Sequence, residues 1–147
     1  MPAGTHPAAT PASSPHAAKT SPETVRVDAA LQRHLERSWP ADLPPTTARF
    51  LVRDAKAVLA ADATGVGRGR WPTVFGAGQD PVVASFSRVR VQAAVARRDG
   101  SARQAVVHLV WAAADAGGSY AQGRIADVYF TLTSTEGHPV WTPQSLH

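Results

Sequence analysis

The chain has 147 residues, a formal charge of +4 and no cysteine. This length is typical of a single domain and is sufficient to bury a hydrophobic core without covalent crosslinks. The missing cysteines exclude disulfide scaffolds, zinc fingers and thiol catalysis. No run of about 18 apolar residues occurs, so the sequence predicts no transmembrane helix.

The first 22 residues are rich in proline, alanine, threonine and serine and contain hardly any large apolar side chain. This composition predicts a disordered tail over residues 1–22 and a single folded domain over residues 23–147. The tail has neither the basic start nor the apolar stretch of a secretory signal, which favours a cytoplasmic location. The alternative is a linker that tethers the domain to an anchor on an upstream segment.

Two helices are expected first. A capping serine, a proline and an acid at residues 21–23 predict a helix start, and the following apolar residues recur at helical spacing as far as the Trp-Pro pair at 39–40. A second helix is expected from a cap at Thr46 or Thr47 to Gly65. The short proline-rich connection predicts that the two helices pack as a pair.

Beyond Gly65 the spacing of the apolar residues changes from helical to alternating. Alternation indicates strands, and turn residues separate them. Strands are expected at 88–95, 105–112, 124–135 and 140–142, with reversals at 99–100, 117–118 and 136–139. This order predicts an α+β fold in which two N-terminal helices pack on a four-stranded antiparallel sheet.

The Asp-Gly pair at 99–100 sets the first register. As the two central residues of a tight hairpin, it pairs Arg88 with Trp111 and Val91 with His108. The Arg88 guanidinium can then lie over the indole ring.

The second reversal leaves two registers open. A two-residue loop at 117–118 places His108 opposite Asp127, whereas a three-residue loop that begins at Ala116 shifts the third strand by one residue and exchanges its faces. We favour the second register because it aligns Val128, Phe130 and Leu132 with Val91 and Val106, which concentrates the apolar residues on one face of the sheet.

The other face of the sheet is also apolar in either register. It carries Val107, Leu109 and Trp111 beside Arg88 and Arg90. A sheet that is apolar on both faces needs two covers, and the helix pair supplies one. These five residues are therefore expected to form an interaction surface for a second subunit, a protein partner or a ligand.

Four residues offer the most reactive combination in the sequence: His108, Asp127, Tyr129 and Tyr120. A carboxylate beside an imidazole orients it as a general base, and a tyrosine hydroxyl can donate to a developing oxyanion. The pairing of His108 with Asp127 requires the register that we do not favour. The ordinary interpretation is two tyrosines at strand edges and a solvated aspartate.

Neither a metal site nor a cofactor is expected. The six histidines include no pair at the spacing that places two imidazoles on one ion. The glycine-rich stretch at 65–69 follows a helix and precedes Trp-Pro, whereas a dinucleotide loop follows a strand and precedes a helix. It also lacks the lysine of a phosphate loop.

Residues 66–103 contain seven arginines against Asp80 and Asp99. Such a patch can follow a phosphate backbone. No known reading motif accompanies it, so any binding to nucleic acid would be weak and independent of sequence.

Several of these features together resemble the nuclear transport factor 2-like superfamily over roughly residues 25–143. They are the two N-terminal helices, the long strands at 88–95 and 105–112, the third strand at 128–132 and the closing Gly-x-x-x-Trp-x-Pro stretch at 137–143. The resemblance implies a strongly curved sheet that wraps a helix as a cone. It also implies either a small isomerase or cyclase with a pocket in the cone, or a non-catalytic scaffold domain of a conjugation or secretion machine, which often dimerises. The sequence departs from the pattern in having no evident third helix between Gly65 and Val82, which implies a shallow cone.

The leading hypothesis is a non-catalytic protein-interaction module that self-associates, with a homodimer or a protein partner on the sheet face. One alternative is a small pocket enzyme of isomerase or cyclase type that uses His108 and Asp127. The other is a basic, sequence-independent nucleic-acid binder.

Overall fold

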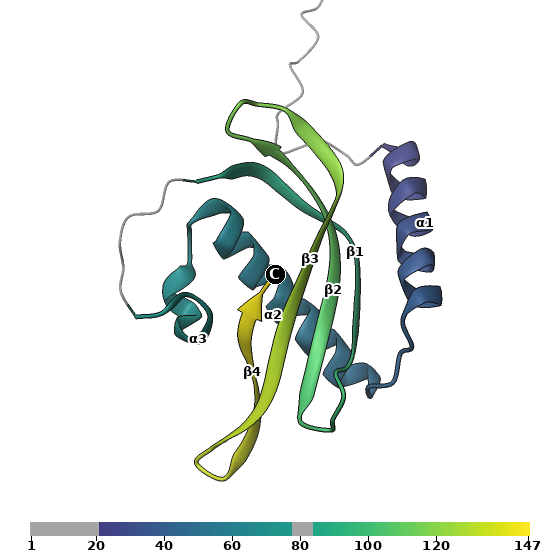
Figure 1. Cartoon of the computed structure of the whole chain (residues 1–147). Helices are drawn as coiled ribbons and strands as arrows, with labels where there is room; N and C mark the ends of the chain where they lie inside the picture. Colours follow the sequence, from purple (N-terminus) through teal and green to yellow (C-terminus); the bar gives the residue numbers. More distant parts are fainter. Residues whose placement is uncertain (1–20, 78–83) are drawn as a thin grey trace, which may run out of the picture.

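A computed structural model of the chain describes residues 21–77 and 84–147. The elements, in chain order, are α1 (Pro22–Ser38), α2 (Pro45–Thr64), the 3-10 turn η2 (Arg68–Arg70), α3 (Pro72–Phe75), β1 (Phe86–Arg98), β2 (Gln104–Asp115), β3 (Tyr120–Thr135) and β4 (His138–Leu146). The strands form one antiparallel sheet in the order β1-β2-β3-β4. The α+β class and the four-stranded meander are confirmed (Figure 1). Residues 1–20 of the expected tail lie outside the described residues.

The start of α1 agrees with the sequence. The Ser21 hydroxyl accepts the backbone N–H of Thr24 at 3.1 Å, and Pro22 occupies the first turn. Ser21 and Pro22, which were assigned to the tail, therefore belong to the cap and first turn of α1. The helix ends where Trp39 becomes extended, as the Trp-Pro pair predicts.

The start of α2 differs from the prediction, and its end agrees with it. The helix begins at Pro45 and no side chain caps it, so the expected threonine cap is wrong. Proline suits this position because the N–H groups of the first turn of a helix have no partner within the helix, and proline has no N–H group to leave unpaired. Gly65 ends the helix with φ 75°, and its N–H donates to the Ala61 carbonyl at 2.9 Å.

A short third helix follows α2. The four residues of α3 lie beside β4, where the Thr73 hydroxyl donates to the Pro143 carbonyl at 2.6 Å. The sequence predicted no third helix, whereas the structure contains a third helix of a single turn. No helix in residues 21–77 or 84–147 is long and apolar enough to span a membrane.

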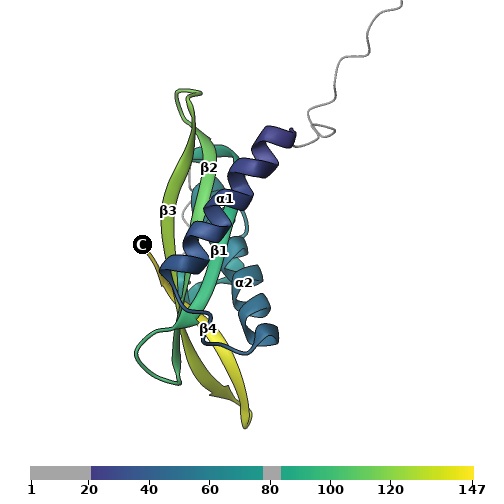
Figure 2. The ribbon, with the colours of Figure 1, turned by 90° about the vertical axis from the view of Figure 1, so that its right-hand side faces the viewer.

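The two long helices cover different faces of the sheet instead of packing as a pair. α2 packs against the face that carries Val107, Leu109 and Phe130, whereas α1 packs through Leu31, Leu35 and Trp39 against Ala93, Val95 and Val110. Figure 2 shows β1 between the two helices. The expected pairing of the helices is wrong because alternation in β1 and β2 produces two apolar faces, and each face is covered by one helix.

The hairpin between β1 and β2 is longer than predicted. β1 ends at Arg98 and β2 begins at Gln104, which leaves a five-residue loop. The Asp99 N–H donates to the Gln104 carbonyl at 2.9 Å. Gly100 has the expected positive φ of 77°, but it lies inside this loop. The Ser101 carbonyl accepts the Gln104 N–H within the loop. Bonds of this kind stabilise a wider turn than the Asp-Gly pair alone implies.

This wider loop shifts every pair between the two strands. His108 lies opposite Val95 and Trp111 lies opposite Val91. The predicted pairs of Val91 with His108 and of Arg88 with Trp111 are therefore wrong.

The reversal between β2 and β3 combines features of both predicted registers. Asp115 and Ser119 close a three-residue loop that begins at Ala116, as we favoured. Beyond the loop, β3 contains one extra residue between Ala121 and Arg124, and from there His108 lies opposite Asp127. The favoured pairing is wrong over the rest of the strand, because this β-bulge restores the register of the shorter loop.

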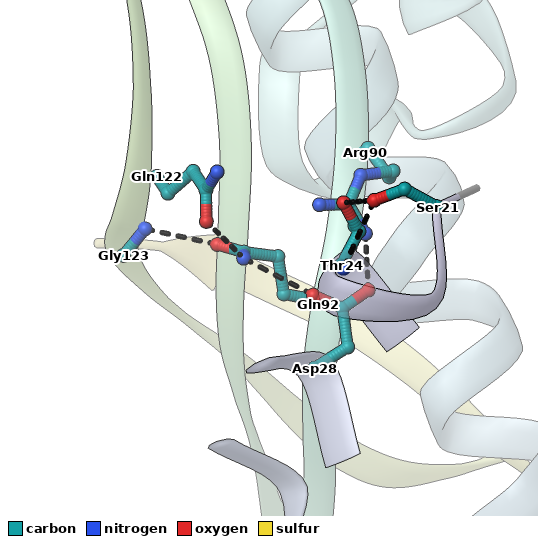
Figure 3. A network of polar contacts seen from close by, with 7 residues as sticks. All are labelled: Ser21, Thr24, Asp28, Arg90, Gln92, Gln122 and Gly123. Atoms are coloured by element: carbon teal, nitrogen blue, oxygen red, sulfur yellow. Dashed lines mark hydrogen bonds and ion pairs between the residues drawn. The ribbon is translucent and has the colours of Figure 1, made fainter. Parts of the chain in front are cut away.

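The bulge in β3 is joined to a bulge in β1 by a buried glutamine. Gln92 is the extra residue in β1, and its Oε1 accepts the N–H of Gly123, which has φ 72°, at 2.9 Å. Its Nε2 donates to Gln122 and to Asp28 of α1, each at 3.2 Å, and Asp28 also pairs with Arg90 (Figure 3). These bonds connect α1 to the two bulged strands.

The free edge of β1 is covered in part by side chains. The Gln32 amide of α1 donates to the Ala94 carbonyl at 2.8 Å and accepts the Ala94 N–H at 2.9 Å. A neighbouring strand would use the same two groups. The Asp42 carboxylate accepts the Arg98 N–H at 2.8 Å. Covering an edge in this way limits strand pairing with other chains.

We expect Gln32→Ala to lower the free energy of unfolding by about 1–2 kcal/mol, because two hydrogen bonds to half-buried backbone groups are lost. Urea unfolding measures the change. The matched control is Gln144→Ala, since Gln144 is exposed and its amide reaches only Thr142 of its own strand, at 3.4 Å. Equal effects of the two substitutions would contradict a role for Gln32 at the strand edge.

Candidate functional site

His108 and Asp127 face each other across β2 and β3. The His108 Nδ1 lies 2.7 Å from the Asp127 Oδ1. His108 is 7% exposed, and Asp127 is half-buried. The pair that the alternative enzyme hypothesis requires is therefore present, on the face of the sheet that α1 partly covers.

The second nitrogen of His108 is also occupied. The Arg97 Nε–H donates to His108 Nε2 at 2.9 Å. An arginine can only donate, so Nε2 is the acceptor and Nδ1 carries the proton that is donated to Asp127. The imidazole thus has no free lone pair with which to remove a proton from a substrate.

Trp39 completes this cluster. Its ring stacks on the His108 ring at a centroid distance of 4.3 Å, and the Arg97 guanidinium lies 4.3 Å from the Trp39 ring centroid. Trp39 follows the last residue of α1, so these contacts hold the end of that helix against the sheet. The arrangement is that of a satisfied structural cluster.

The two tyrosines lie in different places. Tyr129 is on the same face of β3 as Asp127, and its ring centroid lies 5.7 Å from that of His147. Tyr120 is at the other end of β3, opposite Ala114. The structure therefore brings together three of the four candidate residues and separates Tyr120 from them.

The predicted interaction residues Val107, Leu109 and Trp111 are in the core. Their exposed fractions are 0%, 0% and 7%, and they contact the α2 side of the core. The expectation that they meet a partner is wrong, because α2 covers this face while α1 covers part of the other.

Arg88 and Arg90 make contacts within the chain. The Arg88 guanidinium lies 5.0 Å from the Tyr120 ring centroid, and not over Trp111 as predicted. The guanidinium that lies near the Trp111 ring, 5.6 Å from its centroid, is that of Arg124. Arg90 pairs with Asp28. Burial alone would lower the pKa of Arg90, but hydrogen bonds to Asp28 and Tyr120 outweigh it, and the pKa is raised.

The arginines of the basic region 66–103 are distributed among internal partners. Arg68 bonds the end of α2, Arg97 bonds His108, and Arg98 bonds Asp42. Arg70 lies over Trp71, and Arg103 donates to the Leu132 carbonyl. Asp80 of this region lies outside the described residues.

A groove on the outer face of the sheet was not predicted. We call it the outer groove; it has a volume of about 570 Å³ between α1 and β3, and its apolar lining includes Leu31, Leu35, Trp39 and Ile125. Ile125 is 78% exposed although it lies within a regular strand. In the sequence, alternation along the strand places Ile125 on the face opposite to Ala126, Val128 and Phe130. Which of the two faces is exposed can be decided only when the register is known.

A second cavity lies between α2, α3 and the C-terminal part of the chain, and Ile125 borders it as well as the outer groove. It has a volume of about 370 Å³, and its titratable lining residues are Asp62 and His147. Asp62 is paired with Arg68 at 3.6 Å. Neither His108 nor Asp127 lines this inner cavity. Within residues 21–77 and 84–147, no group of three histidine or acidic side chains is placed to hold a metal ion.

We expect His108→Leu to lower the free energy of unfolding by about 1–3 kcal/mol, because Arg97 and Asp127 lose their common partner in a half-buried site. Urea unfolding provides the measurement. His138→Leu is the control, since His138 is an exposed residue at the start of β4 and lies outside the outer groove. A His108→Leu protein as stable as this control would contradict the structural role of the cluster.

Comparisons of the chain with protein-family models, with curated proteins and with solved structures find no match. The function is therefore inferred from the chain's own geometry.

Proposed function

We propose that this chain is a non-catalytic protein-interaction module that forms a homodimer through the outer face of its sheet. The observation that carries this proposal is the exposure of Ile125. Ile125 is 78% exposed and borders an apolar groove, so covering both with a second surface would remove apolar area from water.

The surface around Ile125 is suited to contact a second copy of itself. A protruding residue and an apolar recess lie side by side, since Ile125 borders the outer groove and the groove contains Leu31, Leu35 and Trp39. In a two-fold symmetric dimer the same patch faces itself. Each Ile125 can then enter the groove of the other copy.

The state of His108 argues against the enzyme alternative. Both ring nitrogens are engaged by Arg97 and Asp127, and Trp39 covers a face of the ring. A general base needs a nitrogen within reach of the substrate proton. The outer groove thus presents an apolar surface beside a satisfied polar cluster.

Membership of the nuclear transport factor 2-like superfamily is part of this proposal. It is supported by the two N-terminal helices, the short α3 and the open four-stranded antiparallel sheet. By that likeness, the chain corresponds to the scaffold domains of conjugation or export machinery.

We expect Ile125→Arg to raise the dimer dissociation constant at least about tenfold, because the dimer would have to bury an unpaired charge. Light scattering across a dilution series measures the oligomeric state. Val66→Arg is the matched control, since Val66 is 76% exposed in the loop after α2. A wild-type chain that stays monomeric at high concentration would contradict the dimer.

A further inference from the structure

A second groove lies between α1 and α2, where both helices border β1. We call it the α1–α2 groove; its volume is about 1010 Å³. Its floor is formed by β1 at Ala94, Val95 and Ala96. This groove is separate from the outer groove in which Ile125 lies.

The floor of the groove leaves little strand edge open. Gln32 occupies the N–H and C=O of Ala94, and Asp42 occupies the N–H of Arg98. Ala96, between them, is 4% exposed and belongs to the core cluster. The groove therefore offers its lining side chains, and not a free strand edge, to a partner.

Small residues leave room for another backbone at this point. Ala41 and Ala48 line the groove together with Ala94 and Ala96, and Val52 adds a half-buried apolar contact. A single extended segment can lie along this floor with its side chains alternating between the two helices.

One wall of the groove is basic. Arg49, Arg53 and Lys56 are exposed and follow one another at helical i, i+4 and i+7 positions, so they form a row about 10 Å long on one side of α2. The Arg53 guanidinium lies 3.4 Å from Asp54 and 4.7 Å from the Phe50 ring centroid, and the Arg53 side chain is 71% exposed. The one carboxylate among the groove's lining residues is Glu36, which accepts a hydrogen bond from Gln32.

We infer that the α1–α2 groove binds an extended, acidic segment of a partner protein. Carboxylates at alternate positions of the segment face the basic row. Alternate residues of a strand are about 6.8 Å apart, so two successive carboxylates fit within the length of the row. The residue between them points the opposite way, toward α1.

The chain itself does not provide such a segment in its N-terminal part. Residues 1–20 contain no aspartate or glutamate and include Lys19, and the whole chain carries a charge of +4. Charge complementarity therefore favours a different protein over the chain's own tail or a second copy.

The test is a titration of the full chain with a fluorescein-labelled peptide of alternating valine and glutamate, followed by anisotropy. We expect saturable binding that weakens at least about tenfold in the variant R49E/R53E/K56E. The matched control is R26E/R33E/R37E, which makes the same change in net charge on exposed positions of α1 and should change the affinity less than about threefold. Circular dichroism verifies that both variants are folded.

Other outcomes overturn the inference. Equal loss of affinity in both triple variants would show general charge attraction, and tighter binding of single-stranded oligothymidylate than of the peptide would show a phosphate site. In heteronuclear NMR spectra we expect the Ala96 amide resonance to shift when peptide is added. An unchanged Ala96 resonance in the presence of bound peptide would show that the peptide binds outside this groove.

The same titration with Ile125→Arg separates this inference from the proposed homodimer. The α1–α2 groove does not include Ile125, so the peptide affinity should be unchanged in that variant. Loss of peptide binding together with loss of the dimer would mean that the acidic segment does not bind at this groove.

Discussion

The hydrogen bond from the Gly123 N–H to the Gln92 side chain supports the register on which both faces of the sheet depend. A slip of β3 by one residue would bring Ile125 and Asp127 to the α2 side and expose Val128 and Phe130, which are at most 1% exposed. Burial of each large apolar side chain is worth about 1.5–3 kcal/mol, and a carboxylate in an apolar core is costly. The bulge thus decides which residues form the core and which reach a partner.

The position of β1 between the two helices determines where the grooves lie. This edge strand has α2 on one face and α1 on the other, so each helix covers only part of its face. One consequence is the outer groove between α1 and β3. The other is the α1–α2 groove at the strand edge. Both candidate interaction surfaces therefore arise from the same placement of two helices around one strand.

The polar groups of the described region mostly serve to hold these helices in place. Asp28 joins α1 to the bulged strands, and the His108 cluster joins the end of α1 to β2 and β3. Several arginines of the basic region 66–103 make similar internal contacts, so the positive charge of the sequence does not collect on one surface there. The basic row on α2 lies outside that region and was not singled out by charge counting.

Local signals in the sequence determined the elements of this protein. The Ser-Pro cap, the Trp-Pro stop and Gly65 each act through the backbone of their own turn, and alternation of apolar residues is a property of single strands. The tertiary structure decided the rest: the five-residue loop after β1, the bulges at Gln92 and Gly123, and the opposite placement of α1 and α2. These features depend on contacts such as Gln92 with Gly123, between residues far apart in the chain, and one extra residue in a strand reverses every side chain beyond it. His108 and Asp127 were thus neighbours only in the register that we did not favour, and neither the burial of Leu109 nor the exposure of Ile125 could be predicted from the sequence.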